Sequence, residues 1–289
     1  MHTSNPFPTD LDQKAGIDQA PRPLVAVAWA EFPWLVHGFS TRAGGVSRAY
    51  ARPAEPGELN LGFTADDTAE NVRENRRRLV EAVTGSGTTP LMTVRQIHSD
   101  RSEVVPLNLG EGQCWDAPQA DGLLTRRTGI LLGIMTADCV PVLVADPRHR
   151  AVAAFHAGWR GTVERVVEQG IARMHKEFGS LPGEMIAAIG PAIGRCCYAV
   201  GDEVRTRFGS EFSYGEELFA QMGTPAGNSR SVLDLVDANR RQLLAAGLTV
   251  GAISLVGGCT SCHTELYFSH RASGGRAGRM MSVIGIKAE

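Results

Sequence analysis

Three apolar segments of strand length follow one another closely in the middle of the chain. They cover residues 130–136, 140–145 and 151–155 and are rich in side chains that favour β-structure. Cys139 falls in the break between the first two segments, and His156 comes directly after the third. The pattern therefore predicts three core strands, with a cysteine and a histidine at strand ends.

Further strands and helices are predicted on both sides of this core. The hydrophobic pattern favours strands over residues 34–40, 91–97, 185–189, 250–256 and 281–286. It favours helices from Asp67 or Thr68 to about Val83, over 158–179 and around 233–246, and irregular glycine-rich segments over 41–47 and 190–194. Strands and helices are intermixed without strict βαβ alternation. We therefore expect an α/β, α+β-like sandwich with helices flanking one mixed sheet, rather than a doubly wound fold.

No linker or internal repeat divides the chain after its first residues, so we expect one domain over residues 24–289. Residues 1–23 are acidic and lack the apolar stretch of a signal peptide, which predicts a disordered lead-in. No apolar run is long enough to cross a bilayer. We expect a cytoplasmic protein with reduced cysteines. The net charge of −2 gives no electrostatic reason to expect nucleic acid or a membrane as partner, and the oligomeric state is not indicated.

One cysteine and two histidines form a candidate metal site. His98 follows the predicted strand 91–97, and Cys139 and His156 flank the core strands. One thiolate and two imidazoles suit Zn²⁺, with a fourth position left to water or substrate as in catalytic zinc sites. A buried cysteine or a hydrogen-bonded histidine is the commoner role of each residue, so wide spacing alone is weak evidence for a metal.

Several longer segments are similar to one known family. Residues 96–98, 136–143 and 156–162 resemble the signature of the YfiH family, whose members are also called laccase-domain proteins, polyphenol oxidases and multifunctional purine nucleoside phosphorylases. Shorter segments resemble the family in the same order, namely 40–47, 59–62, 74–76, 120–122, 190–194, 198–201, 259–260, 268–269 and 278–280. The resemblance runs from about residue 34 to residue 286, which makes it a specific signal.

The resemblance implies a single α/β domain that holds zinc through His98, Cys139 and His156. It also implies phosphorolysis of adenosine, inosine, guanosine and methylthioadenosine, together with deamination of adenosine. Substrates would then be a small nucleoside and phosphate. Phosphate needs cations, and Arg42 and Arg160 are the candidates because both lie in glycine-rich segments near the expected ligands. No catalytic group beyond the metal and its water is identified.

Two features near the C-terminus need separate interpretation. Residues 259–263 read Cys-Thr-Ser-Cys-His, the pattern of covalent haem attachment. Haem attachment requires export, so we prefer a structural role, and a second metal site built from Cys259, Cys262 and His263 stays open. The family often shows two arginines after Phe-Ser, whereas this chain keeps only Arg271 after Ser269.

The sequence also leaves three alternative functions open. A Cys/His/His set also binds copper, which would suit a laccase-like polyphenol oxidase, although a multicopper enzyme needs further histidine clusters. Cys139 could instead be the nucleophile of a cysteine hydrolase, with His156 or His98 as its base. A non-catalytic role in the quality of peptidoglycan precursors is the third. A cytidine-deaminase site is excluded, because Gly158 stands where the H-x-E motif needs glutamate.

Overall fold

Two mixed β-sheets pack face to face in this computed structural model, which describes residues 20–51, 56–107, 115–223 and 229–288. The first sheet has the order β1 (Leu35–Phe39), β14 (Met280–Ile286), β6 (Ile130–Thr136) and β3 (Leu91–Thr93). The second has the order β13 (Ile253–Leu255), β9 (Ile186–Ile189), β7 (Val140–Asp146), β8 (Ala151–Ala157), β5 (Gly122–Thr125) and β4 (Ser102–Val104). The predicted α/β class is confirmed, but two large sheets replace the single sheet that we expected.

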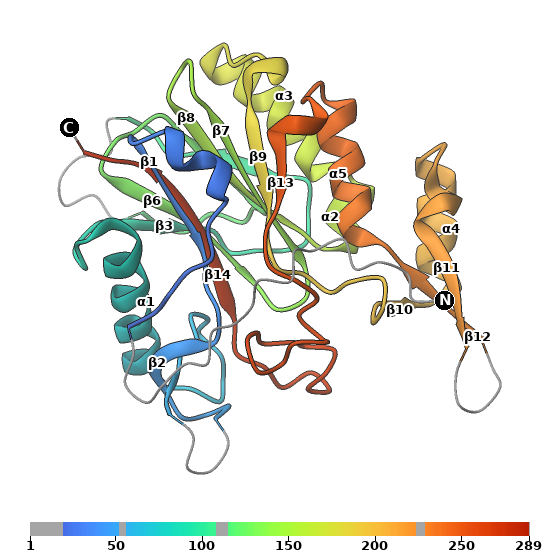
Figure 1. Ribbon diagram of the computed structural model, residues 1–289, viewed down its shortest axis with the longest axis horizontal. Coiled ribbons are helices and arrows are strands. Elements are labelled where there is room, and N and C mark those ends of the chain that lie inside the picture. The colour runs from blue at the N-terminus through green and yellow to red at the C-terminus, as the bar shows by residue number, and fades with distance from the viewer. Residues whose placement is uncertain (1–19, 52–55, 108–114, 224–228, 289) are drawn as a thin grey trace.

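Helices cover the outer face of each sheet (Figure 1). The first sheet packs against α1 (Ala69–Thr84), whereas the second packs against α2 (Trp159–Val163), α3 (Val166–Phe178) and α5 (Leu235–Ala245). A small sheet of β10 (Ala199–Val200), β12 (Ser229–Leu233) and β11 (Phe219–Gly223) lies near α4 (Asp202–Glu211). The remaining elements are β2 (Ala43–Ser47) and 3-10 turns at Val27–Glu31, Pro182–Glu184, Gly215–Leu218 and Val250–Ala252.

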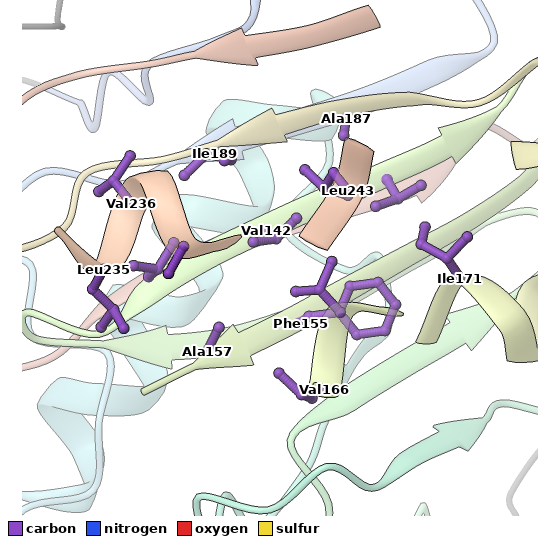
Figure 2. Packing of buried hydrophobic residues seen from close by; sticks show 14 of the residues in the cluster. Val142, Phe155, Ala157, Val166, Ile171, Ala187, Ile189, Leu235, Val236 and Leu243 are labelled. Carbon is purple, nitrogen blue, oxygen red and sulfur yellow. The ribbon is translucent and has the colours of Figure 1, made fainter. Parts of the chain in front are cut away.

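The central strands are apolar throughout because both of their faces are buried. Along β7, Val142 and Val144 pack toward the helices, while Leu143 and Ala145 pack toward the first sheet. Figure 2 shows Val142 among the side chains contributed by the helices and by neighbouring strands of the second sheet. A strand buried on both faces has no polar alternation to interrupt its apolar run. This burial explains why residues 130–136 were predicted with their observed bounds.

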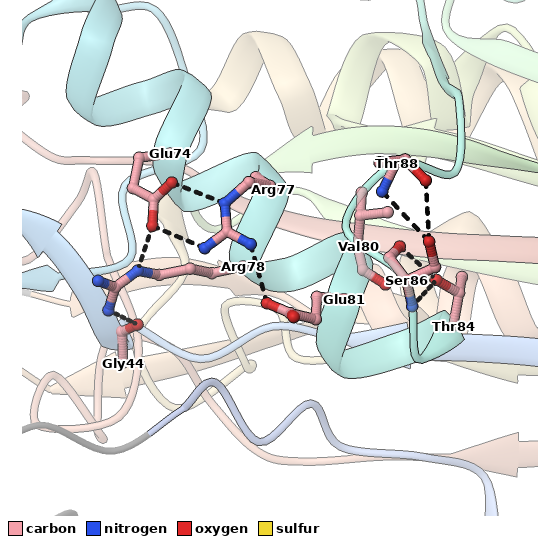
Figure 3. Close-up of polar contacts among 9 residues, drawn as sticks. All are labelled: Gly44, Glu74, Arg77, Arg78, Val80, Glu81, Thr84, Ser86 and Thr88. Atoms are coloured by element: carbon pink, nitrogen blue, oxygen red, sulfur yellow. Dashed lines mark hydrogen bonds and ion pairs between the residues drawn. The ribbon is translucent and has the colours of Figure 1, made fainter.

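Helix α1 begins and ends as its sequence indicates. Its N-cap is Thr68, whose hydroxyl accepts a hydrogen bond from the Asn71 N–H at 3.2 Å. The helix ends at Thr84, and its C-cap is Gly85, which has a φ of 79°. Its exposed face carries a network of arginines and glutamates around Glu74 and Arg77 (Figure 3). Exposed ion pairs of this kind contribute little to stability, so packing on the sheet holds the helix in place.

Several predicted bounds are wrong, and the differences surround the candidate metal ligands. The predicted strand 91–97 ends at Thr93, so His98 lies in a loop rather than at a strand end. The strand over 151–155 extends to Ala157, which places His156 inside β8. The segment 41–47 contains β2 instead of only a turn, and a 3-10 turn occupies the start of the predicted strand 250–256. Tertiary contacts decide where a strand stops, and local pattern does not report them.

The predicted helix over 158–179 is two helices. The break lies at Arg165, whose φ of 62° is left-handed. The Arg165 guanidinium binds Glu168 at 2.9 Å and Glu211 of α4 at 2.8 Å, which ties the break to a neighbouring helix. The apolar spacing continues through the break, so the sequence pattern alone could not reveal it.

Among the residues with described positions, no helix is long and apolar enough to cross a membrane. The cytoplasmic location expected from the sequence stays a prediction, as does the single domain over 24–289. Most of the predicted disordered lead-in, residues 1–19, lies outside the described residues.

Candidate metal centre

The fold brings His98, Cys139 and His156 together where β7 begins and β8 ends, in the middle of the second sheet. One ligand atom from each residue lies within 4.8 Å of the other two. The two imidazole rings stand nearly perpendicular, with centroids 4.9 Å apart. His156 is buried in β8, Cys139 is half-buried in the turn between β6 and β7, and His98 is exposed. One thiolate and two imidazoles that converge from one side fit a tetrahedral metal with an open fourth position.

Asp121 positions two of the three side chains, and no sequence pattern had indicated this role. Its carboxylate accepts hydrogen bonds from the backbone N–H groups of Ile97, His98 and Ser99, at 3.2, 3.0 and 2.6 Å. The same carboxylate lies 2.8 Å from Nδ1 of His156. This contact leaves Nε2 of His156 to bind a metal, the usual arrangement of a carboxylate behind a histidine ligand. The resemblance had included residues 120–122, which was the signal available for Asp121.

Protonation of the metal-free site reflects the same contacts. Burial raises the pKa of the Cys139 thiol, but the charge on His156 and hydrogen bonds from both histidines outweigh burial and lower it to about 6. Burial lowers the pKa of His156, but Cys139 and Asp121 outweigh it and raise this pKa to about 9. Cys139 and His156 therefore stabilise each other's charged forms, the thiolate and the imidazolium. A metal bound at Nε2 of His156 would displace the imidazolium proton there, as metals displace protons from thiol and imidazole ligands in general.

The backbone is left-handed at His98 and at Asp138, the residue before Cys139. Their φ values are 60° and 87°, a region that residues other than glycine rarely adopt. Hydrogen bonds offset the cost at Asp138, because its carboxylate accepts from the Thr260 hydroxyl at 2.6 Å and from the Arg271 N–H at 2.6 Å. Asp138 therefore supports the turn that presents Cys139.

Gly158 and Gln96 complete the frame around the ligands. A Cβ atom at Gly158 would lie 2.9 Å from the His98 ring and 3.1 Å from Sγ of Cys139, so no larger residue fits there without movement. The Gln96 side chain exchanges two 2.7 Å hydrogen bonds with the backbone of Met135. These two bonds fix the His98 loop against the end of β6.

The two predicted phosphate-binding arginines have different surroundings. Arg160 is exposed in α2, and its guanidinium lies 4.5 Å from the centroid of the Trp159 ring. This guanidinium forms no hydrogen bond or ion pair with any residue in the described ranges. Arg42 is held by Glu58, whose carboxylate accepts from Nε at 2.7 Å, and by the carbonyl oxygen of Thr264. Phosphate binding by Arg42 would have to compete with Glu58, whereas Arg160 is available.

Tyr198 and Arg271 lie near the same centre. Burial raises the pKa of the Tyr198 hydroxyl, the Cys139 charge raises it further, and the charges of Arg271 and Arg160 lower it. The Arg271 guanidinium lies 5.3 Å from the centroid of the Tyr198 ring and donates to the Ala199 carbonyl oxygen at 2.7 Å. The Tyr198 hydroxyl thus interacts electrostatically with Cys139 and with two cations, and the sequence pattern had not assigned Tyr198.

The chain is similar to one known family over most of its length. The family described as "Multi-copper polyphenol oxidoreductase laccase" matches residues 36–287. A Bacteroides thetaiotaomicron protein named purine nucleoside phosphorylase is 36% identical over 86% of this chain and 91% of its own length. A protein named adenosine deaminase RL5, from an unknown prokaryote, is 34% identical over 86% of this chain and 93% of its own. The crystal structure of YlmD from Geobacillus stearothermophilus superimposes with a TM-score of 0.78 at 34% identity, over 94% of this chain and 99% of the other.

Proposed function

The chain belongs to the family described as multi-copper polyphenol oxidoreductase laccase, and because relatives that it matches over most of their length are named purine nucleoside phosphorylase, we propose that it is a zinc-dependent purine nucleoside phosphorylase. Its substrates would be adenosine, inosine, guanosine and methylthioadenosine, and it would also deaminate adenosine. The convergence of His98, Cys139 and His156 carries this proposal. Relatives named for phosphorolysis and for deamination over most of their length support it.

Zinc is the metal we propose at this centre. Bound there, it would supply positive charge and an acidified water molecule. His98, Cys139 and His156 would hold it, and Asp121 would fix the orientation of His156 through Nδ1. Copper also suits one sulfur and two nitrogens, and it is the metal of the second candidate function considered below.

Phosphate would bind beside the metal through Arg160. Its guanidinium is exposed and free of carboxylate partners in the described ranges, so it can offer two parallel N–H groups to phosphate oxygens. The guanidinium groups of Arg160 and Arg271 lie 4.5 and 5.3 Å from the ring centroids of Trp159 and Tyr198, and a purine could stack on such a ring. Arg42 remains a second candidate for phosphate, subject to its bond with Glu58.

Product analysis with adenosine tests this function directly. Zinc-loaded protein is expected to release adenine and ribose 1-phosphate when phosphate is present, and inosine and ammonia when phosphate is omitted. Both products follow from one site that binds a purine nucleoside beside a metal. Oxidation of phenols by copper-loaded protein without turnover of any nucleoside would contradict the proposal.

Arg160→Lys is expected to weaken phosphorolysis of inosine more than deamination of adenosine. A lysine keeps the charge but cannot form two parallel hydrogen bonds to phosphate. The expected loss is about 2 kcal/mol of transition-state stabilisation, or about 30-fold in kcat/KM for phosphorolysis. The measurement is the ratio of the two activities, with Arg42→Lys assayed beside it. Equal losses in both reactions for either variant would assign that arginine to the fold or the metal centre instead of phosphate.

A copper-dependent polyphenol oxidase is the second candidate, favoured by the family description. Only two groups of three or more metal-binding side chains occur in the part of the chain that the structure describes, and only one contains histidine. A multicopper oxidase would need further histidine ligands. A cysteine hydrolase would use the same Cys139 and His156 pair. No observation among the described residues favours a role in the quality of peptidoglycan precursors.

A further inference from the structure

Four cysteine side chains meet in a second cluster, outside the candidate metal centre. Cys196 and Cys197 lie in the loop after β9, and Cys259 and Cys262 lie in the loop after β13. Their sulfur atoms all lie within 4.8 Å of one another, and all four are free thiols. Residues from two loops more than 60 positions apart thus present four soft ligands at one point.

The spacing of the sulfurs matches one tetrahedral ion. Zn–S bonds of about 2.3 Å place the sulfurs of a tetrahedron about 3.8 Å apart. Sγ of Cys262 lies 3.4 Å from Sγ of Cys196 and 3.4 Å from Sγ of Cys197. A disulfide needs about 2.05 Å, well below these distances. In a [4Fe–4S] cluster each cysteine binds a different iron, which spreads the sulfurs wider than one ion does.

Backbone contacts already hold the two loops in register. Ala192 and Cys259 form a parallel bridge, in which the Thr260 N–H donates to the Ala192 carbonyl oxygen at 3.0 Å. The Gly194 N–H lies 3.2 Å from Sγ of Cys259 and points its hydrogen at that sulfur. Backbone N–H groups directed at sulfur stabilise thiolate ligands, so this contact favours a bound metal.

We propose that Cys196, Cys197, Cys259 and Cys262 hold one zinc ion in a second, structural site. Four protein ligands close the coordination sphere and leave no position for substrate, which separates this site from the first. Binding removes the remaining protons from the four thiols. The site does not depend on the proposed nucleoside activity.

The proposed ion would join two loops that both contact the turn carrying Cys139. The Ile193 N–H donates to the Asp138 carbonyl oxygen at 2.9 Å, and the Thr260 hydroxyl donates to the Asp138 carboxylate. Both cysteine-bearing loops therefore contact the residue that precedes Cys139. Joining the loops through a metal would fix the turn that presents this ligand.

The cluster also replaces the second site considered from the sequence. His263, the histidine of the haem-like pattern, lies 3.2 Å from Glu265 through Nδ1 and is not among the converging ligands. Cys196 and Cys197 take its place beside Cys259 and Cys262. Residues 259–263 therefore contribute two cysteines to a metal cluster, and His263 offers a matched control.

Metal analysis of the full-length protein, purified without chelators, tests this site. Wild type is expected to contain two zinc ions per chain, and Cys262→Ser is expected to contain one. Cys139→Ala should also contain one, because it loses only the ion of the first centre. His263→Ala should keep both ions. One zinc in wild type together with an unchanged content in Cys262→Ser would overturn the proposal, and iron in place of zinc would overturn the choice of metal.

Alkylation of wild type gives a test that does not depend on folding of a variant. In zinc-loaded protein the four cysteines should be protected from an alkylating reagent, and all four should react once a chelator removes the metal. Mass spectrometry of peptides identifies each modified cysteine. Rapid alkylation of the four in the presence of zinc, or disulfides among them in freshly purified protein, would show that no ion is bound there.

Discussion

Cys139→Ala is expected to release the ion held with His98 and His156 and to reduce kcat/KM for nucleosides by more than about 100-fold. The size follows from the milder loss of 10–100-fold that results when only a residue behind a metal ligand is removed. Cys139 supplies the single thiolate of the centre, and two histidines alone bind zinc far more weakly. The measurement is zinc per chain and activity, each relative to wild type.

The control for this variant is wild-type protein that has been stripped by a chelator and then reloaded. Stripping should remove activity, and added zinc should restore it to wild type but not to Cys139→Ala. A cysteine hydrolase would also lose activity in Cys139→Ala, but its wild type would stay active without metal. Full activity in the stripped protein would therefore favour the nucleophile hypothesis over the metal centre.

Asp121→Asn is expected to weaken zinc binding at the first centre by about 10–100-fold, the usual effect of losing a carboxylate behind a histidine ligand. The carboxylate of Asp121 lies 2.8 Å from Nδ1 of His156 and also anchors the loop that carries His98. An asparagine has the same size but only one oxygen, so it cannot accept hydrogen bonds at both positions, and the His156 ring loses its fixed orientation. Competition with a chelator of known affinity measures the change.

Asp146→Asn is a matched control within the same sheet. Asp146 is also fully buried, lies 2.8 Å from Nδ1 of His149, and accepts hydrogen bonds from the N–H groups of Arg148 and His149. Its histidine belongs to neither metal cluster. Zinc affinity should therefore stay at the wild-type value in Asp146→Asn even if stability falls. The same loss of affinity in both variants would show a general effect of the buried carboxylates.

Some strands and helices could be predicted from the sequence, because the local pattern of apolar residues reflects which side chains are buried. Residues 130–136 form the predicted strand with the predicted bounds, and α1 is capped by Thr68, one of the two predicted caps. Both features depend on side chains within a few positions of one another, which is the range that alternation and capping describe. The residue types together with the family resemblance indicated three candidate ligands, and the structure brings all of them together.

What the tertiary structure decided involves contacts between distant residues. Asp121 lies 35 positions before His156, and Cys196 lies 66 positions before Cys262, so no periodic pattern connects either pair. Arg42 is a similar case, because the sequence of residues 41–47 does not indicate its bond to Glu58. The chain's sequence determined which short segments become strands and which residue types can bind metal. Only the packing of two sheets, which brings separate loops together, determined which of those residues meet.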